Sequence, residues 1–253
     1  MSSVMEASAS KESLSLAKIR YQTSLMMTRD KKNQDRLNII PEKLTRRQCI
    51  SKVAEIYDLT GKIAPRVAAT KLDLQQLNLR QLQWDDVLPN ELRQVWLNHF
   101  ETMQEIGSIR FKRSIVPKDA VDMQIETLDF GDASQSLVCV SIYAQFRLKD
   151  GPYSCQLVFS RTRTVQKTSL PRAELYAELL NVYTSEIVKR SFKGLVVSFK
   201  KFTDSQIALH WTSNDQKPLK EWVRNRVIEI NRFSSKDQWA YIQSYDNIAD
   251  LGT

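Results

Sequence analysis

The chain contains few of the residues that build zinc sites, disulfide frameworks or membrane spans. It has only two histidines and three cysteines among 253 residues. Cys49, Cys139 and Cys155 are widely spaced and predict neither a zinc site nor a disulfide framework, so we expect small buried side chains. No apolar run approaches the ~20 residues that span a bilayer, and the first residues contain no apolar signal core. These absences predict an intracellular protein, cytoplasmic or nuclear, with no membrane partner.

Two catalytic signatures are also missing. No Tyr-x-Asp-Asp motif occurs, so we do not expect the chain to synthesise DNA. No Asp-Thr/Ser-Gly triplet occurs either, because Asp58–Gly61 reads Asp-Leu-Thr-Gly and is one residue too long. The sequence therefore gives no site for an aspartic protease.

The charge balance favours a polyanionic partner. The net charge is +8 at pH 7, and lysine and arginine side chains attract phosphate groups and release their counterions. Many basic proteins bind no nucleic acid, so charge alone indicates only the class of partner.

The first half of the chain divides into a polar segment and a helical segment. Residues 1–42 are Ser-rich and then strongly charged, which predicts a poorly ordered or partly helical segment. Residues 43–117 have helical periodicity, with Thr45 as a candidate N-cap and Pro65 near a helix start. Pro117 lies in a polar stretch that predicts a boundary. The helices are expected over 46–59, 64–79 and 90–106. We expect the five tryptophans of the chain to be core residues.

Residues 123–253 change to a mixed pattern. The segments SLVCVSIYAQFRL and SCQLVFSRTRTV are rich in β-branched residues and are separated by the turn signal Asp-Gly-Pro. With IETLDFGD before them, they predict a three-stranded antiparallel meander. The later elements are expected as a helix over 171–189, a strand over 195–199, a short helix after 204, a helix over 219–233 and a short strand within 238–244. This order predicts a mixed α/β sheet.

Four carboxylates lie where elements of this region begin or end. Asp132 and Asp204 follow strand-like runs, Glu174 lies one turn into a helix, and Asp250 lies at a late helix start. If they converge on one cleft, they repel one another unless cations neutralise them. Mg²⁺ prefers carboxylate oxygens, and two ions roughly 3.5–4 Å apart can assist phosphodiester cleavage. Their number alone would equally fit unrelated surface acids that cap elements.

Ordered sequence blocks surround these acids. They read FGDASQ, LPRAELYAELL, FTDSQIALHW and DNIAD, and WVRNRVIEI lies between the last two. Together they resemble the ribonuclease H domain of Bel/Pao-type LTR retrotransposons. Upstream, KLTRRQCISKVAEIYDLTGKIAPRVAATKLDLQQL and LQWDDVLPNELRQVW resemble the segment that links polymerase to ribonuclease H in those Pol polyproteins. The resemblance covers about 43–253 in the correct order.

The resemblance implies a fold, a reaction and a metal site. The fold is a ribonuclease H-like mixed five-stranded sheet flanked by helices, over 123–253, preceded by a small all-helical segment. The reaction is endonucleolytic hydrolysis of the RNA strand of an RNA–DNA hybrid, and other Pol products are candidate partners. The implied catalytic and metal-binding residues, for two Mg²⁺ or Mn²⁺ ions, are Asp132, Glu174, Asp204 and Asp250.

Four polar residues are candidates for binding nucleic acid. Ser134 follows Asp132, while Ser169 and Arg172 precede Glu174, and Asn247 precedes the last acid as in the family's Asn-Pro-Ala-Asp block. Their positions suggest contacts with sugar or phosphate, and the 2′-hydroxyls would mark the RNA strand. Each residue could equally be a cap or a solvated surface group.

The chain departs from the family pattern near its last acid. Tyr241 stands where the family usually has a histidine, and Ile248 replaces a proline. The sequence ends at Thr253, so we expect Asp250 to lie on a frayed terminus. These departures leave an alternative open, a catalytically weak or inactive remnant that binds nucleic acid or protein. A third alternative is an integrase-like or other nuclease of the same fold.

Overall fold

The computed structural model describes residues 42–56, 58–107, 114–151, 153–166, 168–213 and 218–253. The polar N-terminal segment expected over 1–42 therefore lies almost wholly outside the described residues. The described chain forms two compact units. The sheet unit contains Thr60–Ala68 and Ile115–Thr253, and the helical unit contains the described parts of Gln22–Leu59 and Ala69–Ser114.

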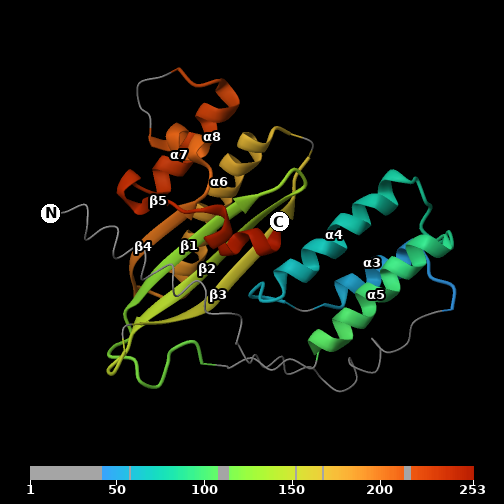
Figure 1. Cartoon of the computed structure of the whole chain (residues 1–253), viewed down its shortest axis with the longest axis horizontal. Coiled ribbons are helices and arrows are strands. Elements are labelled where there is room, and N and C mark those ends of the chain that lie inside the picture. The colour runs from blue at the N-terminus through green and yellow to red at the C-terminus, as the bar shows by residue number, and fades with distance from the viewer. Residues whose placement is uncertain (1–41, 57, 108–113, 152, 167, 214–217) are drawn as a thin grey trace. The chain divides into compact units, whose positions relative to one another are not determined.

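The elements follow the expected order of helices, meander and alternating helix and strand (Figure 1). In chain order they are α3 (Arg46–Ala54), α4 (Ala64–Leu79), α5 (Asn90–Gly107), β1 (Ile125–Ala133), β2 (Leu137–Arg147), β3 (Tyr153–Thr164), α6 (Leu170–Ser191), β4 (Val196–Thr203), α7 (Gln206–Ser213), α8 (Glu221–Phe233), β5 (Trp239–Tyr241) and the 3₁₀ helices η1 (Lys236–Gln238), η2 (Ser244–Asp246) and η3 (Ile248–Gly252). No helix in these ranges is long and apolar enough to cross a membrane.

Helix α3 begins where the sequence predicts and ends earlier. Thr45 forms a capping box with Gln48, which satisfies backbone N–H groups of the first turn. The helix ends at Ala54, so the prediction of a helix to residue 59 is wrong. Thr60 belongs to the sheet unit, where its carbonyl accepts the Ser160 N–H at 2.8 Å. The chain leaves the helix before it reaches that contact.

The helical unit has its own apolar core. Trp96 is fully buried at its centre and packs with Phe100 at 6.0 Å between ring centroids. Trp84 is 48% exposed, so the expectation that all the tryptophans are core is wrong. The Arg46 guanidinium carbon lies 4.8 Å from the Trp84 ring centroid, a cation–π contact that a surface ring can make. The buried core residues are Leu44, Cys49, Leu77, Leu88, Trp96, Phe100 and Met103.

The sheet unit contains a five-stranded mixed sheet in the order β3-β2-β1-β4-β5. The meander pairs β1, β2 and β3 antiparallel, whereas β4 lies parallel to β1 and β5 lies parallel to β4. This is the sheet expected from the sequence. Because β1 and β4 are parallel neighbours, their carboxyl ends lie at the same edge.

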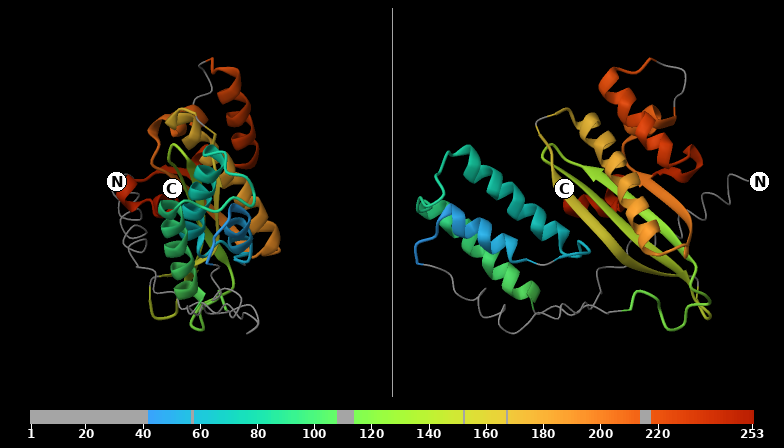
Figure 2. Two further views of the ribbon diagram at one scale, coloured as in Figure 1. Left: turned by 90° about the vertical axis from the view of Figure 1, so that its right-hand side faces the viewer. Right: turned by 180° about the vertical axis from the view of Figure 1, so that it is seen from behind.

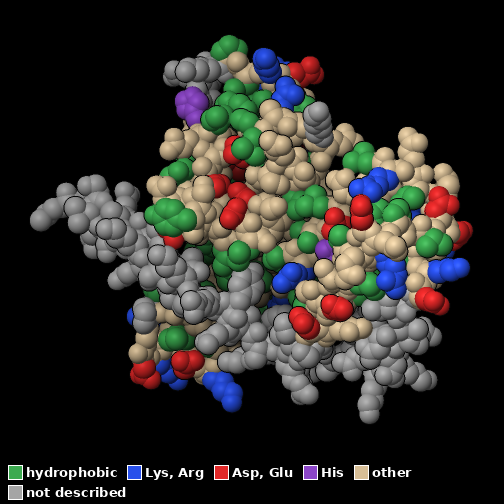
Figure 3. Space-filling model, turned by 45° about the vertical axis from the view of Figure 1, so that its right-hand side comes forward, with side chains coloured by type: hydrophobic (Ala, Val, Ile, Leu, Met, Phe, Trp, Pro, Cys, Tyr) green, Lys and Arg blue, Asp and Glu red, His purple; other side chains and the backbone are tan. Residues whose placement is uncertain are grey.

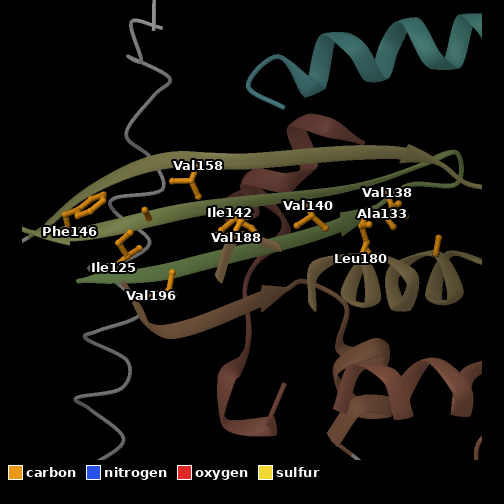
Figure 4. Packing of buried hydrophobic residues seen from close by; sticks show 13 residues of the cluster. Ile125, Ala133, Val138, Val140, Ile142, Phe146, Val158, Leu180, Val188 and Val196 are labelled. Carbon is orange, nitrogen blue, oxygen red and sulfur yellow. The ribbon is translucent and has the colours of Figure 1, made fainter. Parts of the chain in front are cut away.

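Helices cover one face of the sheet and the C-terminal segment packs on the other. Figure 2 shows α6 crossing the sheet, with α7 and α8 beside it. The core beneath α6 contains Val140 and Ile142 of β2 and Leu180 of α6 (Figure 4). On the opposite face, Phe130 and Phe202 stack with ring centroids 5.0 Å apart, in one cluster with the buried Ala249 of η3. Both faces of β1 are therefore buried, which fixes its position.

Strand β4 is longer than its sequence pattern predicts. The expected strand over 195–199 omits Lys200 and Lys201, because two lysines rarely lie in a buried strand. Lys201 is nevertheless 2% exposed, since its ammonium group lies 2.7 Å from a carboxylate oxygen of Asp129 on β1. The pair allows β4 to continue to Thr203.

Candidate functional site

The sheet brings three of the predicted acids to one region, and a late 3₁₀ helix adds the fourth. Asp132 is the second-last residue of β1, and Asp204 directly follows β4. Glu174 lies near the start of α6, and the Ser205 hydroxyl, next to Asp204, donates to its Oε2 at 2.6 Å. Asp250 lies in η3, which packs against β1 and β2. Segments far apart in sequence therefore carry the acids to neighbouring positions.

The electrostatics show that these acids influence one another. Burial raises the pKa of Asp132 to about 6, and repulsion from Asp204 and Asp250 acts in the same direction. The Thr253 hydroxyl and the Ala133 N–H partly oppose this increase. Burial also raises the pKa of Glu174, with repulsion from Asp204 as a smaller cause. Neighbouring carboxylates are thus close enough to disfavour the charged forms of Asp132 and Glu174.

Neutral groups donate to the carboxylates. The Asn247 amide donates to Asp204 at 3.2 Å, and the Thr253 hydroxyl donates to Asp132. Within the described residues, no ion pair joins a lysine or arginine to Asp132, Glu174, Asp204 or Asp250. Figure 3 shows acidic side chains gathered on one face, bordered mainly by uncharged atoms. The negative charge of the site is not neutralised by described side chains.

The donor chemistry fits a hard divalent cation. Carboxylate oxygens suit Mg²⁺ and Mn²⁺. Burial is the main cause of the raised Asp132 pKa, and a cation would offset the smaller contribution from the charges of Asp204 and Asp250. Across the described ranges, however, no three His, Cys, Asp or Glu side chains lie close enough to hold an ion as they stand. The residues therefore fit a site in which side chains must draw together around the cation.

The C-terminal segment is packed rather than frayed, contrary to the expectation from its position. Ala249 is fully buried, and the Asn247 side-chain oxygen caps η3 by accepting the Ala249 N–H at 3.2 Å. Gly252 lies so close to β2 that an added Cβ would be 2.3 Å from the Cys139 sulfur. Glycine is needed at this position for the close approach of the chain. The contact holds Asp250 beside the sheet.

The four nucleic-acid candidates have different environments. Ser134 Oγ accepts the Ser136 and Leu137 N–H groups at 3.3 and 3.1 Å, so it stabilises the β1–β2 turn. Ser169 is the exposed N-cap residue of α6 and makes no side-chain capping bond. Arg172 is half-buried, and its guanidinium carbon lies 5.2 Å from the Trp222 ring centroid. Asn247 is buried and also donates to the Gly131 carbonyl at 2.9 Å, which favours a positioning role for it.

Two further residues lie near the acids. Tyr241, which replaces the family histidine, pairs in register with Thr203 and is 39% exposed. Glu178 lies one helical turn after Glu174 and is fully buried, and burial raises its pKa well above the usual value. The Thr203 hydroxyl partly opposes this shift, although no hydrogen bond of ordinary geometry reaches either Glu178 oxygen in the described structure. The i,i+4 spacing from Glu174 is the sequence signal that could have indicated Glu178.

The family assignment follows from a sequence match. The family model described as Pao retrotransposon-like RNaseH-like domain matches residues 45–205. The chain belongs to this family. The match includes Asp132, Glu174 and Asp204 and ends before Asp250. It therefore supports the ribonuclease H-like fold of the sheet unit and leaves the fourth acid outside the matched range.

Solved ribonucleases H are similar to about half of the chain at low sequence identity. No curated protein matches the chain. The ribonuclease H1 of the archaeon Halobacterium salinarum is 12% identical over 50% of this chain and 90% of its own, with a TM-score of 0.31. LC11-RNase H1, solved with an RNA/DNA hybrid, is 14% identical over 50% of this chain and 91% of its own, with a TM-score of 0.34.

A foamy viral protease-reverse transcriptase, solved with double-stranded DNA, is also similar. It is 11% identical over 85% of this chain, with a TM-score of 0.46, and the match spans 35% of its length. The fold assignment rests on the sheet order and on the family match.

Proposed function

We propose that this chain is a ribonuclease H-type endonuclease that hydrolyses the RNA strand of RNA–DNA hybrids with divalent metal ions. What supports the proposal is that β1, α6, the end of β4 and η3 carry Asp132, Glu174, Asp204 and Asp250. Beside burial, the charges of Asp204 and Asp250 raise the pKa of Asp132, and the charge of Asp204 raises the pKa of Glu174. A fold seldom brings several carboxylates together without a compensating cation. A retroelement Pol fragment that acts in the cytoplasm or nucleus is the setting that we infer from the family.

The four acids would hold two Mg²⁺ or Mn²⁺ ions. When bound, such ions supply an activated water and stabilise the leaving oxygen of the phosphodiester. Asp132, with its pKa of about 6, is mostly deprotonated at neutral pH and available as a ligand. Ser205 orients Glu174, and Asn247 orients Asp204, through the hydrogen bonds at 2.6 and 3.2 Å. Such positioning contacts typically affect metal affinity or activity by 10–100-fold.

Recognition of the substrate would use groups at the start of α6. Ser169 and Arg172 lie in the first turn region of the helix that carries Glu174, and helix N-termini attract phosphate. We propose that these two side chains contact the nucleic-acid backbone beside the scissile bond. Ser134 is a weaker candidate, since its hydroxyl oxygen already accepts two backbone N–H groups.

A second candidate function is a nucleic-acid-binding remnant with little activity. Two observations favour it: no described set of three metal-ligating side chains is ready to hold an ion, and Tyr241 occupies the histidine position. Divalent metal titration separates the candidates. Saturable stabilisation by Mg²⁺ or Mn²⁺ that depends on Asp132 and Asp204 supports the nuclease, whereas hybrid binding without any metal response supports the remnant.

A further inference from the structure

A stripe of polar side chains lies between α6 and β4 and ends at the acids. On α6 its members are spaced about one helical turn apart, and on the β4 side they are alternate residues, so each set shares one face. The stripe consists of Glu174, Glu178, Asn181 and Ser185 of α6, Lys201 and Thr203 of β4, and Ser205 directly after β4. In the described structure, every member except Glu178 makes a hydrogen bond with another member.

Glu178 lies in the middle of this stripe without a partner. Its side chain is fully buried, and neither carboxyl oxygen has a hydrogen-bond partner among the described residues. Burial raises its pKa well above the usual value, and the Glu174 charge adds to the increase, so the group is a neutral carboxylic acid at neutral pH. A neutral carboxyl group can both donate and accept a hydrogen bond. Burying it without a partner costs about 1–3 kcal/mol, which an apolar residue of similar size would avoid.

Thr203 connects Glu178 to the acids. The Thr203 hydroxyl partly opposes the rise in the Glu178 pKa, although the two side chains do not reach ordinary hydrogen-bond geometry. The same hydroxyl accepts the Ser205 N–H at 3.2 Å, and the Ser205 hydroxyl donates to Glu174 at 2.6 Å. Asp204 lies between these two residues in the chain. A movement of this turn toward Glu178 would therefore also move Asp204 and the group that orients Glu174.

We propose that Glu178 is a positioning residue that binds the Thr203 hydroxyl when Glu174 and Asp204 draw together around a divalent cation. The inference rests on the proposed function. Two separate observations fit this one movement. The Glu178 carboxyl group lacks a partner, and no three metal-ligating side chains of the described residues lie close enough to hold an ion. Glu178 acts through Thr203 and touches neither the cation nor the substrate.

The test measures Mn²⁺ binding by the full-length protein, through the electron paramagnetic resonance signal of free Mn²⁺. Glu178→Met removes the hydrogen-bonding group at similar size and is expected to weaken Mn²⁺ binding by about 10-fold or more. Glu178→Gln keeps a neutral group that donates and accepts, and it should bind Mn²⁺ as wild type does. In urea denaturation with EDTA, Glu178→Met should be at least as stable as wild type, because an apolar side chain replaces a buried polar group without a partner.

A double-mutant cycle with Thr203→Val tests the route of the effect. If Glu178 acts through the Thr203 hydroxyl, Glu178→Met and Thr203→Val together should weaken Mn²⁺ binding no more than the larger single change. Thr184→Val is the matched control. Thr184 is a buried polar residue on the same helix, but its hydroxyl donates within the helix to the Leu180 carbonyl at 2.6 Å, so this variant should bind Mn²⁺ as wild type does.

The inference is overturned by unchanged Mn²⁺ affinity in Glu178→Met, by an equal loss in Glu178→Gln or Thr184→Val, or by additive effects of Glu178→Met and Thr203→Val. An unfolded Glu178→Met would also overturn it, because Glu178 would then be a core residue. If wild type and Glu178→Met bind Mn²⁺ and cleave the hybrid equally, the proposed function stands and the positioning role fails. If the variants show the expected Mn²⁺ affinities but wild type never cleaves, the positioning role stands and the nuclease proposal fails. Absence of Mn²⁺ binding by wild type overturns both.

Discussion

Lys201 on β4 and Asp129 on β1 form a buried ion pair directly across two parallel strands. The ammonium nitrogen lies 2.7 Å from Asp129 Oδ2, and the two side chains are 2% and 0% exposed. Asp132 lies three residues after Asp129, and Asp204 lies three residues after Lys201. The pair therefore fixes the register of the two strands. This register places Asp132 and Asp204 at the same end of the sheet. The same ammonium group donates to Ser185 Oγ and Asn181 Oδ1 of α6, so the helix also contacts this pair.

Breaking this pair is expected to destabilise the sheet unit. Lys201→Met leaves the Asp129 charge buried and unpaired, so we expect a loss of about 3–5 kcal/mol in the free energy of unfolding. Adding Asp129→Asn removes the unpaired charge and should recover most of that loss. Urea denaturation of the two variants checks the expectation. A single variant as stable as wild type would show that the pair does not hold the strands.

The close packing of Gly252 predicts a specific sensitivity to added volume. Gly252→Ala places a methyl group against Cys139, so we expect about 1–3 kcal/mol of destabilisation and a weaker response to Mg²⁺. Gly151→Ala is the matched control, because the nearest atom to its added Cβ is 3.8 Å away. Thermal unfolding with and without Mg²⁺ measures both effects. Equal behaviour of the two variants would refute the anchoring of η3.

The raised pKa of Asp132 predicts how stability changes with pH in the absence of metal. Its folded pKa is about 6 and its ordinary value is 3.8, so the folded state holds the proton more tightly. The stability that this group contributes is complete below about pH 4 and is lost as the pH rises through 6. Between pH 4 and 7, wild type should lose about 2.5 kcal/mol relative to Asp132→Asn. Denaturation in EDTA across this range tests it, and parallel curves for the two proteins would contradict it.

Divalent metal is expected to reverse this penalty at neutral pH. At ten times the dissociation constant, bound Mg²⁺ should stabilise the folded protein by about 1.4 kcal/mol, or about 3–6 °C in Tm. Asp132→Asn and Asp204→Asn should lose this response. Glu126→Gln, an exposed acid on the same strand as Asp132, should keep it. Equal Tm increases in all variants would indicate non-specific binding.

The sequence predicts most of the fold because its local signals agree with the tertiary structure. The capping residue Thr45 and the β-branched runs of the meander each specify an element without reference to the rest of the chain. The early end of α3 was not predictable, because it depends on the contact between Thr60 and Ser160. The extent of β4 was hidden for the same reason, since Lys201 is buried only through Asp129.

The site was less predictable than the fold. The ordered motifs indicate the four acids, but the effects of Asp204 and Asp250 on the Asp132 pKa depend on distances that a sequence does not contain. Asn247 was expected to touch nucleic acid, whereas its amide contacts Asp204 and Gly131. Glu178 was missed because its position beside Thr203 comes from the packing of α6 on β4. Trp222, expected in the core, packs partly buried against the α6–α8 core and also stacks with Arg226.

The most direct test is cleavage of a labelled RNA–DNA hybrid by the full-length protein in Mg²⁺ or Mn²⁺. We predict endonucleolytic products from the RNA strand with 3′-hydroxyl and 5′-phosphate ends, no product in EDTA, and at least a 100-fold lower rate in Asp204→Asn. Glu126→Gln should cleave at the wild-type rate. Absence of cleavage by wild type at high protein concentration in both metals, or equal cleavage by Asp204→Asn, would contradict the proposed function.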